Sequence, residues 1–413
     1  MKAYVHILEQ AAADPTMRLS DYTLFPETAS EESILLGIGD DIETTWPDTL
    51  SKRINHLVET QPNSLALKDP VGRILTYREM GDRVNAIAAA LDTLPAVQPG
   101  SRIGVCCQPS SDMVCALLAI LRLGAVYVPL DSSMPVERLA LICDEAQLSA
   151  LVNDKETAGV AQKLEVGTKV DLTSLPSRIE KIISDRSEAA LNAFIMFTSG
   201  STGKPKGVQL THANYMTQIL AASERLGLQR EIVLQQSSVG FDISLAQIFY
   251  CLANGGTLII TDTQKDPEAL ATLIGREKVT FTLCVPSEYS ILLRHGKEAL
   301  ASCTSWRIAY AGGEAFPLGL KEKFRDLHLD NLEVFNAYGP TEGAIAATIG
   351  AVNYRAINDE IIPIGRRLNN YAAYVVDDDA KPVPVGFPGE LLIGGPGISP
   401  GYWRKSDLTK QKF

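Results

Sequence analysis

The chain has 413 residues and a formal net charge of −11, with 38 basic and 49 acidic side chains. Because one hydrophobic core stops growing well below this length, we expect at least two subdomains. The acidic balance, without any run of lysine or arginine, argues against nucleic acid or an anionic membrane as the main partner.

Cysteine and histidine usage argues against a disulfide framework and against a metal site built from His and Cys. The seven cysteines lack CxxC spacing, which predicts free thiols in a reducing compartment. The five histidines are scattered and form no HExxH motif, and His212 is either a local hydrogen-bonding residue or a catalytic one. Residues 1–10 show no signal-peptide pattern, and the longest apolar run, 113–121, is too short to span a bilayer. We therefore expect a cytoplasmic protein.

The first part of the chain predicts a linker followed by an αβ unit. Residues 1–47 are acidic and irregular and end in the run Asp40–Pro47, which is typical of a linker. From Leu50 the apolar residues recur at helical spacing, and strands then alternate with helices up to residue 190. The predicted strands are 102–107, 127–130 and 150–152, and the predicted helices are 83–94, 113–122 and 138–144.

A second αβ unit is expected over residues 191–345, and the pattern of apolar residues changes after it. Strand patterns recur at 232–234, 257–260, 281–285, 307–310 and 333–336. Over 346–413, short alternating runs are divided by proline and glycine, which predicts a small β-rich subdomain. The expected fold class is α/β: two stacked αβ subdomains, 48–190 and 191–345, with largely parallel sheets, plus the β-rich subdomain.

The segment 197–208 carries most information about function. It reads Phe-Thr-Ser-Gly-Ser-Thr-Gly-Lys-Pro-Lys-Gly-Val and follows an apolar strand. Glycines let backbone N–H groups turn toward one point, hydroxyls add donors and lysines add charge, so the loop suits a polyphosphate. It is not a Walker A loop, because Pro205 follows Gly203-Lys204 and Thr198 stands where the first glycine belongs. A flexible linker is the alternative, but linkers rarely join two apolar segments.

This segment resembles the signature of the adenylate-forming (ANL) enzymes, which include acyl-CoA synthetases, luciferases and the adenylation domains of nonribosomal peptide synthetases. Five further segments resemble the motifs of this superfamily, in the same order along the chain: Leu75–Met80, Leu121–Asp131, Phe241–Ser244, Asn336–Glu342 and Gly389–Gly395. Members continue past the position of Phe413 into a Thr-Gly-Asp motif and a mobile C-terminal subdomain that carries a bridging lysine. The resemblance therefore implies the large N-terminal core of an adenylation domain, weakly active alone, without that mobile subdomain.

The resemblance also implies a nucleotide site. Thr198, with Thr341 and Lys204, has a catalytic role at the phosphates, and Glu342 coordinates Mg²⁺ and is catalytic too. The phosphate loop comprises Thr198, Ser199, Gly200, Ser201, Thr202, Gly203 and Lys204. The remaining ATP-binding residues are Gly312, Gly313 and Glu314 at the adenine wall, Tyr338 stacked on the base, and Asn336, Ala337 and Gly339.

By the same resemblance, Asp242 pairs with the α-ammonium of an amino acid. An unpaired carboxylate in an apolar pocket is costly, so a cationic substrate group fits it; a solvated loop aspartate is the alternative. The implied side-chain pocket is lined by Asp242, Ile243, Ala246, Cys284, Ala309, Ala311, Ala337, Ile345 and Ala346. Because five of these nine are alanine and no second charge is among them, we expect a large aromatic substrate, tryptophan ahead of phenylalanine and tyrosine, and rejection of charged side chains. A loose, unselective pocket is the alternative.

The implied activity is ATP-dependent activation of an amino acid as an aminoacyl-adenylate, followed by loading onto a carrier-protein phosphopantetheine. The segment Trp46–Leu50, at the start of the predicted domain, resembles the corresponding segment of fungal polyketide–peptide hybrids. Residues 1–47 are therefore expected to link an upstream condensation domain to this one, and a carrier domain is expected downstream. A plain N-terminal extension is the alternative for residues 1–47. Rival functions are an acyl- or aryl-CoA ligase and a non-catalytic nucleotide-binding domain.

Overall fold

The first sheet has six strands in the order β6-β5-β3-β4-β7-β8. The computed structural model describes residues 2–18, 21–23, 25–199, 205–262, 266–357 and 361–413. The strands of this sheet are parallel except for the antiparallel hairpin of β7 and β8. They are β3 (Arg102–Cys106), β4 (Val126–Pro129), β5 (Ala150–Asn153), β6 (Lys169–Asp171), β7 (Asn192–Ser199) and β8 (Pro205–Thr211). Its helices are α4 (Tyr77–Asp92), α5 (Ser111–Arg122), α6 (Val136–Ala146) and α7 (Ala158–Gln162).

The second sheet has nine strands in the order β15-β14-β13-β12-β11-β9-β10-β1-β2. Its central strands are parallel, and β2, β14 and β15 are antiparallel to their neighbours. The parallel strands are β1 (Leu65–Lys68), β9 (Ile232–Gln235), β10 (Thr257–Ile260), β11 (Phe281–Cys284), β12 (Ile308–Gly312) and β13 (Glu333–Tyr338). The others are β2 (Ile74–Thr76), β14 (Thr348–Ala351) and β15 (Arg366–Arg367).

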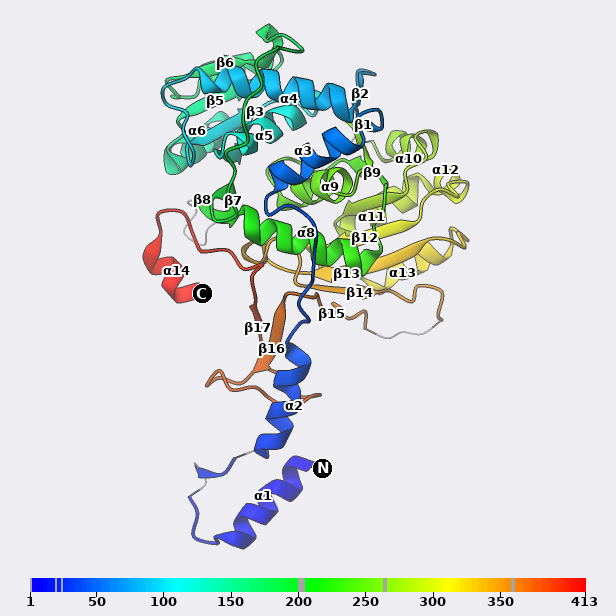
Figure 1. The fold of residues 1–413 in the computed structure, drawn as a ribbon. Helices are drawn as coiled ribbons and strands as arrows, with labels where there is room; N and C mark the ends of the chain where they lie inside the picture. Colours follow the sequence, from blue (N-terminus) through cyan, green and yellow to red (C-terminus); the bar gives the residue numbers. More distant parts are fainter. Residues whose placement is uncertain (1, 19–20, 24, 200–204, 263–265, 358–360) are drawn as a thin grey trace.

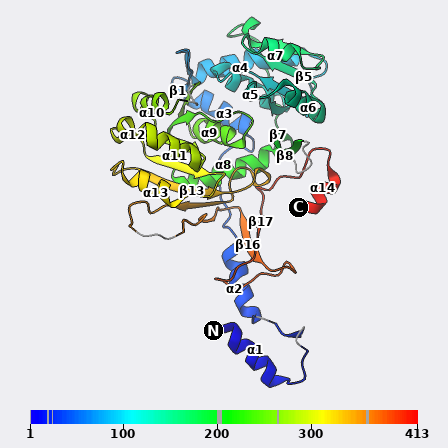
Figure 2. The same ribbon diagram turned by 180° about the vertical axis from the view of Figure 1, so that it is seen from behind.

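Helices cover both faces of the second sheet, as Figures 1 and 2 show from opposite sides. On one face lie α3 (Leu50–Thr60), α8 (His212–Leu226) and α9 (Asp242–Leu252). On the other lie α10 (Pro267–Arg276), α11 (Pro286–His295), α12 (Lys297–Ala301) and α13 (Leu318–Arg325). Each face buries its own hydrophobic cluster, with Tyr310 in the first and Ala309 in the second. The predicted α/β fold class is confirmed.

The two sheets exchange segments across the expected boundaries of the subdomains. β1 and β2, which precede residue 190, belong to the nine-stranded sheet, where β1 pairs with β10 and β2 pairs with β1. β7 and β8, which follow residue 191, complete the six-stranded sheet beside β4. Both exchanges bury strand edges that a strict division of the chain would leave open.

The N-terminal segment is helical, so the expectation that it is irregular is wrong. It forms α1 (Lys2–Ala13) and α2 (Glu27–Gly37), which extend away from the body in Figure 1. α2 lies against the small antiparallel sheet of β16 (Ala372–Val376) and β17 (Glu390–Gly394), where the Ser33 hydroxyl donates to the Val383 carbonyl at 2.7 Å. The short α14 (Ser406–Lys412) ends the chain. No helix in the described part of the chain is long and apolar enough to cross a membrane.

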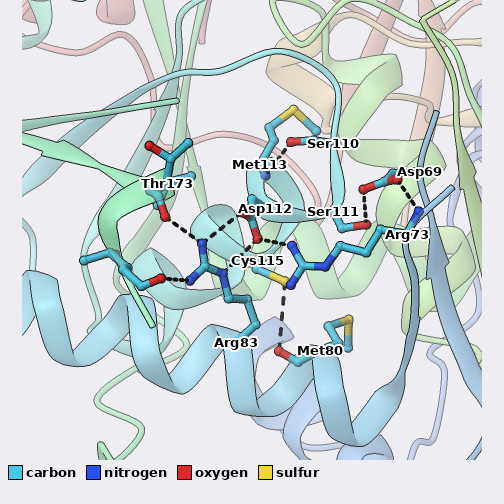
Figure 3. A network of polar contacts seen from close by, with 12 residues as sticks. Asp69, Arg73, Met80, Arg83, Ser110, Ser111, Asp112, Met113, Cys115 and Thr173 are labelled. Carbon is cyan, nitrogen blue, oxygen red and sulfur yellow. Dashed lines mark hydrogen bonds and ion pairs between the residues drawn. The ribbon is translucent and has the colours of Figure 1, made fainter. Parts of the chain in front are cut away.

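A buried ion pair joins α4 to α5 (Figure 3). The Arg83 guanidinium, 4% exposed, donates to both oxygens of Asp112 at 2.8 Å, and Arg73 donates to Asp112 at 2.9 Å. Arg83 also donates to the backbone carbonyl of Leu172. Such bidentate, hydrogen-bonded geometry is what makes a buried ion pair tolerable.

Candidate functional site

A cavity of about 520 Å³ lies where β11, β12 and β13 end and α9 begins. In parallel sheets ligands bind beyond the carboxyl ends of the strands, and this volume is in the usual range for small-molecule sites. The lining residues are Ser237, Ser238, Phe241, Asp242, Ile243, Leu283, Val285, Glu288, Tyr310, Gly312, Gly313, Glu314, Ala337, Gly339, Pro340, Thr341, Ile345 and Ala346.

Asp242 is the first residue of α9 and brings a carboxylate into the cavity. Desolvation raises its pKa, while hydrogen bonds from the Thr341 hydroxyl and the Ile243 N–H lower it in part. The helix N-terminus also favours a negative charge there. No basic side chain among the described residues forms an ion pair with Asp242. The site therefore has a place for one cationic group from a ligand.

Glu342 lies next to Thr341 and forms part of a compact polar cluster with Lys206 and Tyr402. Lys206 Nζ donates to Glu342 Oε1 at 2.9 Å, and the Tyr402 hydroxyl donates to the same oxygen at 2.6 Å. Burial raises the pKa of Glu342, but these two bonds outweigh it and hold the pKa below its ordinary value. Glu342 is thus an ionised carboxylate. Its hard oxygens fit Mg²⁺ or another hard cation whose other ligands are phosphates and waters, because no group of three or more metal-ligating side chains occurs in the described ranges, either at Glu342 or away from it.

The predicted phosphate loop is described only at its edges. Gly200, Ser201, Thr202, Gly203 and Lys204 lie outside the described residues, and Ser199 is the last residue of β7. Thr198 pairs with Lys206 across the β7–β8 hairpin. Its buried hydroxyl has no hydrogen-bond partner in the part of the chain that the structure describes. An orphaned buried donor at the loop's entry fits a phosphate oxygen as its partner.

Most of the residues expected at the adenine site line the same cavity. Gly312, Gly313 and Glu314 line it, and the Glu314 carboxylate accepts from the N–H and hydroxyl of Ser287 at 3.0 and 2.9 Å. Tyr338 is 44% exposed and does not line the cavity. The amide of Asn336 is buried and donates to the Pro363 carbonyl, and Ala337 and Gly339 line the cavity.

The turn after β13 is unusually tight at Gly339. A Cβ there would come within 2.5 Å of the Ala346 Cα, so only glycine fits. Two residues that follow, Ala344 and Ile345, have φ values of 53° and 79°. For a β-branched residue such as Ile345 this is a strained conformation, and such strain concentrates at functional sites. Ile345 lines the cavity.

Five of the nine predicted side-chain pocket residues line the cavity: Asp242, Ile243, Ala337, Ile345 and Ala346. The other four, Ala246, Cys284, Ala309 and Ala311, are fully buried in the hydrophobic clusters instead. On β12 the alternation of a strand puts Tyr310 and Gly312 toward the cavity and turns the two alanines away.

The cavity contains one charged group that was not expected there. Glu288 lines it together with Asp242 and with Glu314, which was expected at the adenine wall, and desolvation raises the pKa of the Glu288 carboxyl. Glu288 is the third residue of α11, and its carboxylate also accepts from the Val285 N–H. The pattern Val-Pro-Ser-Glu, with proline at the first helical position and glutamate in the first turn, is a helix-start signal that could have revealed this placement. Tyr310, Ser237 and Ser238 were missed as well.

Comparison with known proteins gives the family. Residues 54–403 match the family described as AMP-binding enzyme. The chain is 43% identical over 426 residues to the polyketide synthase–nonribosomal peptide synthetase hybrid himA of Aspergillus japonicus, covering all of this chain and 11% of himA. It is 42% identical over 418 residues to the hybrid synthetase psoA of Aspergillus fumigatus, covering 99% of this chain and 10% of psoA. The chain thus spans about a tenth of the length of these relatives.

Solved structures share the fold. The nonribosomal peptide synthetase FmoA3 in its AMPPNP-bound form superposes with a TM-score of 0.87 at 23% identity, covering all of this chain and 44% of FmoA3. The four-domain nonribosomal peptide synthetase holo-AB3403, bound to AMP and glycine, gives 0.84 at 25% identity, over all of this chain and 30% of AB3403. With the match over most of its length, this chain belongs to the AMP-binding enzyme family.

Proposed function

We propose that the chain activates an amino acid with ATP, forming an aminoacyl-adenylate and releasing pyrophosphate, as the adenylation domain of a fungal polyketide–peptide hybrid synthetase. The observation that carries the proposal is the Asp242 carboxylate, which lines the cavity without a basic partner among the described side chains. The relatives himA and psoA are such hybrids, which supports the setting.

The chemistry joins two anions. A carboxylate oxygen of the amino acid forms a bond to the α-phosphorus of ATP, and the bond between that phosphorus and the α–β bridging oxygen breaks, so that pyrophosphate leaves with the electron pair. Asp242 would hold the ammonium group and so position the carboxylate, and Thr341, which donates to Asp242 and lines the same cavity, would contact the α-phosphate. Thr198 and Lys204 hold the outer phosphates, and Glu342 holds Mg²⁺, which neutralises phosphate charge when bound.

The proposed substrate side chain is aromatic, with tryptophan ahead of phenylalanine and tyrosine. Small and apolar groups, Ala337, Ala346 and Ile243, leave room for a large ring on the cavity wall. Glu288 adds a carboxylate acceptor, which an indole N–H can use. Acidic side chains remain unfavourable beside these carboxylates, but the ground for excluding basic ones is gone, so basic amino acids belong in the test.

The remaining parts of the proposal concern the longer protein. An upstream condensation domain and a downstream carrier domain, whose phosphopantetheine accepts the aminoacyl group, are the proposed partners. Residues 1–413 alone turn over slowly in this proposal, because the bridging lysine expected from the family is not among them. A cytoplasmic setting is supported by the seven cysteines, all free and buried.

The test is ATP–pyrophosphate exchange by the protein against a panel of aromatic, basic, acidic and small amino acids. Exchange that depends on an aromatic amino acid supports the proposal, and a maximum with glycine, alanine or a charged amino acid contradicts the substrate class. Exchange that depends on a carboxylic acid without an amine points instead to an acyl- or aryl-CoA ligase. Absence of exchange with every acid, in the protein together with its neighbouring domains, contradicts catalysis.

A further inference from the structure

The polar cluster at Glu342 brings together three separate parts of the chain. Lys206 lies on β8, directly beyond the phosphate loop, and Glu342 lies in the short 3-10 helix after β13. Tyr402 lies between β17 and α14 and pairs with β8. The main chain around Tyr402 is hydrogen-bonded to β8. Tyr402 forms an isolated antiparallel β-bridge with Val208, and the Trp403 N–H donates to the Gly207 carbonyl at 2.7 Å.

The donors in this cluster are arranged unevenly on the carboxylate. Lys206 Nζ and the Tyr402 hydroxyl both donate to Oε1 of Glu342, and they lie 3.2 Å from each other. Lys206 Nζ is also 4.7 Å from the centre of the Tyr402 ring, so the ring holds the ammonium in place as well. None of these side-chain contacts in the described residues uses Oε2, and the N–H of Glu342 itself is a further donor to the carboxylate. Oε1 therefore carries both side-chain donors, and Oε2 is the oxygen without a side-chain donor among the described residues.

The segment that carries Tyr402 also contacts the main chain of Glu342. The N–H of Ser399, three residues before Tyr402, donates to the Glu342 backbone carbonyl at 2.8 Å. The side chain of Glu342 is 18% exposed and that of Lys206 is 27% exposed, so the cluster is shielded yet open to a small ligand. Tyr402 itself is buried, and its ring packs edge-on against Phe413 with the ring centres 5.6 Å apart.

We propose that Tyr402 is a positioning residue for the metal site: its hydroxyl fixes the Glu342 carboxylate so that Oε2 is presented to the Mg²⁺ that accompanies ATP. The proposal rests on the proposed function, in which Glu342 is the magnesium ligand. Tyr402 touches neither metal nor substrate and acts only through Glu342. Residues that orient a metal ligand in this way typically change metal affinity by about 10- to 100-fold when they are removed.

The test is equilibrium binding of ATP by calorimetry, with and without MgCl₂, to the wild type and Tyr402→Phe. Phenylalanine keeps the ring that packs on Phe413 and removes only the hydroxyl. We expect the gain in ATP affinity on adding Mg²⁺ to fall about tenfold or more, while ATP binding without Mg²⁺ is unchanged. The matched control is Tyr354→Phe, which removes a hydroxyl bonded to the Leu329 and Leu332 carbonyls and should leave both affinities unchanged.

A double-mutant cycle separates positioning from a structural role. In a Glu342→Gln background, Tyr402→Phe should cause no further loss of the Mg²⁺ effect, because the negative charge that Tyr402 positions for the metal is already gone. Tyr402→His, which restores a donor, is the second variant and should recover part of the effect. An equal loss in both backgrounds, or an unchanged Mg²⁺ effect in Tyr402→Phe, overturns the proposal for Tyr402 alone. A wild type whose ATP affinity ignores Mg²⁺ overturns the magnesium role of Glu342 as well.

Discussion

At the scale of single residues, the candidate site balances its two central carboxylates in different ways. Glu342 has two donors, and its pKa lies below the ordinary value. Asp242 has only neutral donors, from Thr341 and the backbone, and its pKa is raised by desolvation and by the nearby Glu342. Lys206 therefore keeps Glu342 ionised, whereas Asp242, which has no charged partner among the described residues, would gain most from a ligand cation.

Asp242→Ala should cripple use of the amino acid and spare ATP binding. Loss of one partner of a buried charge pair costs about 2 kcal/mol or more, which corresponds to roughly 30-fold in kcat/KM for the amino acid. The measurement is pyrophosphate exchange at varied amino-acid concentration, together with ATP binding. Asp144→Ala, on an exposed position of α6, is the matched control and should behave as wild type. Unchanged dependence on the amino acid would show that Asp242 has been assigned the wrong role.

Glu342→Gln should weaken the use of Mg²⁺–ATP and leave the fold intact. The amide oxygen of glutamine can still accept the bonds from Lys206 and Tyr402, whereas the charge that holds a metal is lost. Exchange rates at varied MgCl₂ and a thermal unfolding curve measure the two effects separately. Glu333→Gln, an exposed change at the start of β13, serves as the control. A variant with wild-type magnesium dependence contradicts the metal role.

At the scale of elements, starts and ends depend on local signals, and faces depend on packing. The predicted helix 83–94 is α4, but α4 begins at Tyr77, because Thr76 and Glu79 form a capping box. This capping box is recognisable in the sequence and would have predicted the start of the helix. Which face of β12 meets the cavity could not, because every residue of Ile308–Gly312 is buried and a strand covered on both sides carries no alternation of polarity. Ala309 and Ala311 were expected in the pocket from the resemblance to the adenylate-forming enzymes, and the polarity of this strand carries nothing that could have placed Tyr310 there instead.

The Arg83–Asp112 pair links α4 to α5 in addition to their apolar packing. Asp112→Ala should destabilise the protein by about 3 kcal/mol, because Arg83 would keep a buried charge without its partner. Urea unfolding measures the change. Asp82→Ala is the matched control. It removes a carboxylate of α4 that lies 3.7 Å from the guanidinium of Arg178, whose side chain is 76% exposed. This variant should lower the free energy of unfolding by less than about 1 kcal/mol. Equal costs for the two variants would contradict the role of the buried pair.

At the scale of the whole molecule, the α/β class and the order of strands and helices followed from the alternation along the chain, whereas the exchange of β1–β2 and β7–β8 between sheets did not. Local pattern shows that a segment is a strand, but the choice of its neighbour depends on edges contributed by distant segments. The linker is a similar case. Residues after α2 pair with the small sheet, where Ile38 bridges Ala372 and the Asn370 N–H donates to the Asp40 carbonyl at 2.8 Å. Nothing within residues 1–47 alone predicts that contact.

The stability of the whole molecule should fall in mild acid because of His212. This residue starts α8, is fully buried, and neither ring nitrogen has a hydrogen-bond partner in the described ranges. Burial lowers the pKa of His212 to about 4. Below the unfolded-state pKa of about 6.5, the unfolded chain binds a proton that the folded chain resists, so stability is full above about pH 6.5 and is lost as the pH falls toward 4.

The expected loss from His212 is about 2 kcal/mol between pH 7.5 and pH 5, since each pKa unit corresponds to about 1.4 kcal/mol. The raised pKa of Asp242 has the opposite sign, so wild type alone does not isolate the histidine. The measurement is therefore the urea midpoint of wild type and of His212→Leu at both values of pH. We expect the wild type to lose more stability than the variant on acidification, by that amount. An equal loss in the two proteins would mean that His212 takes up a proton in the folded state as readily as in the unfolded one.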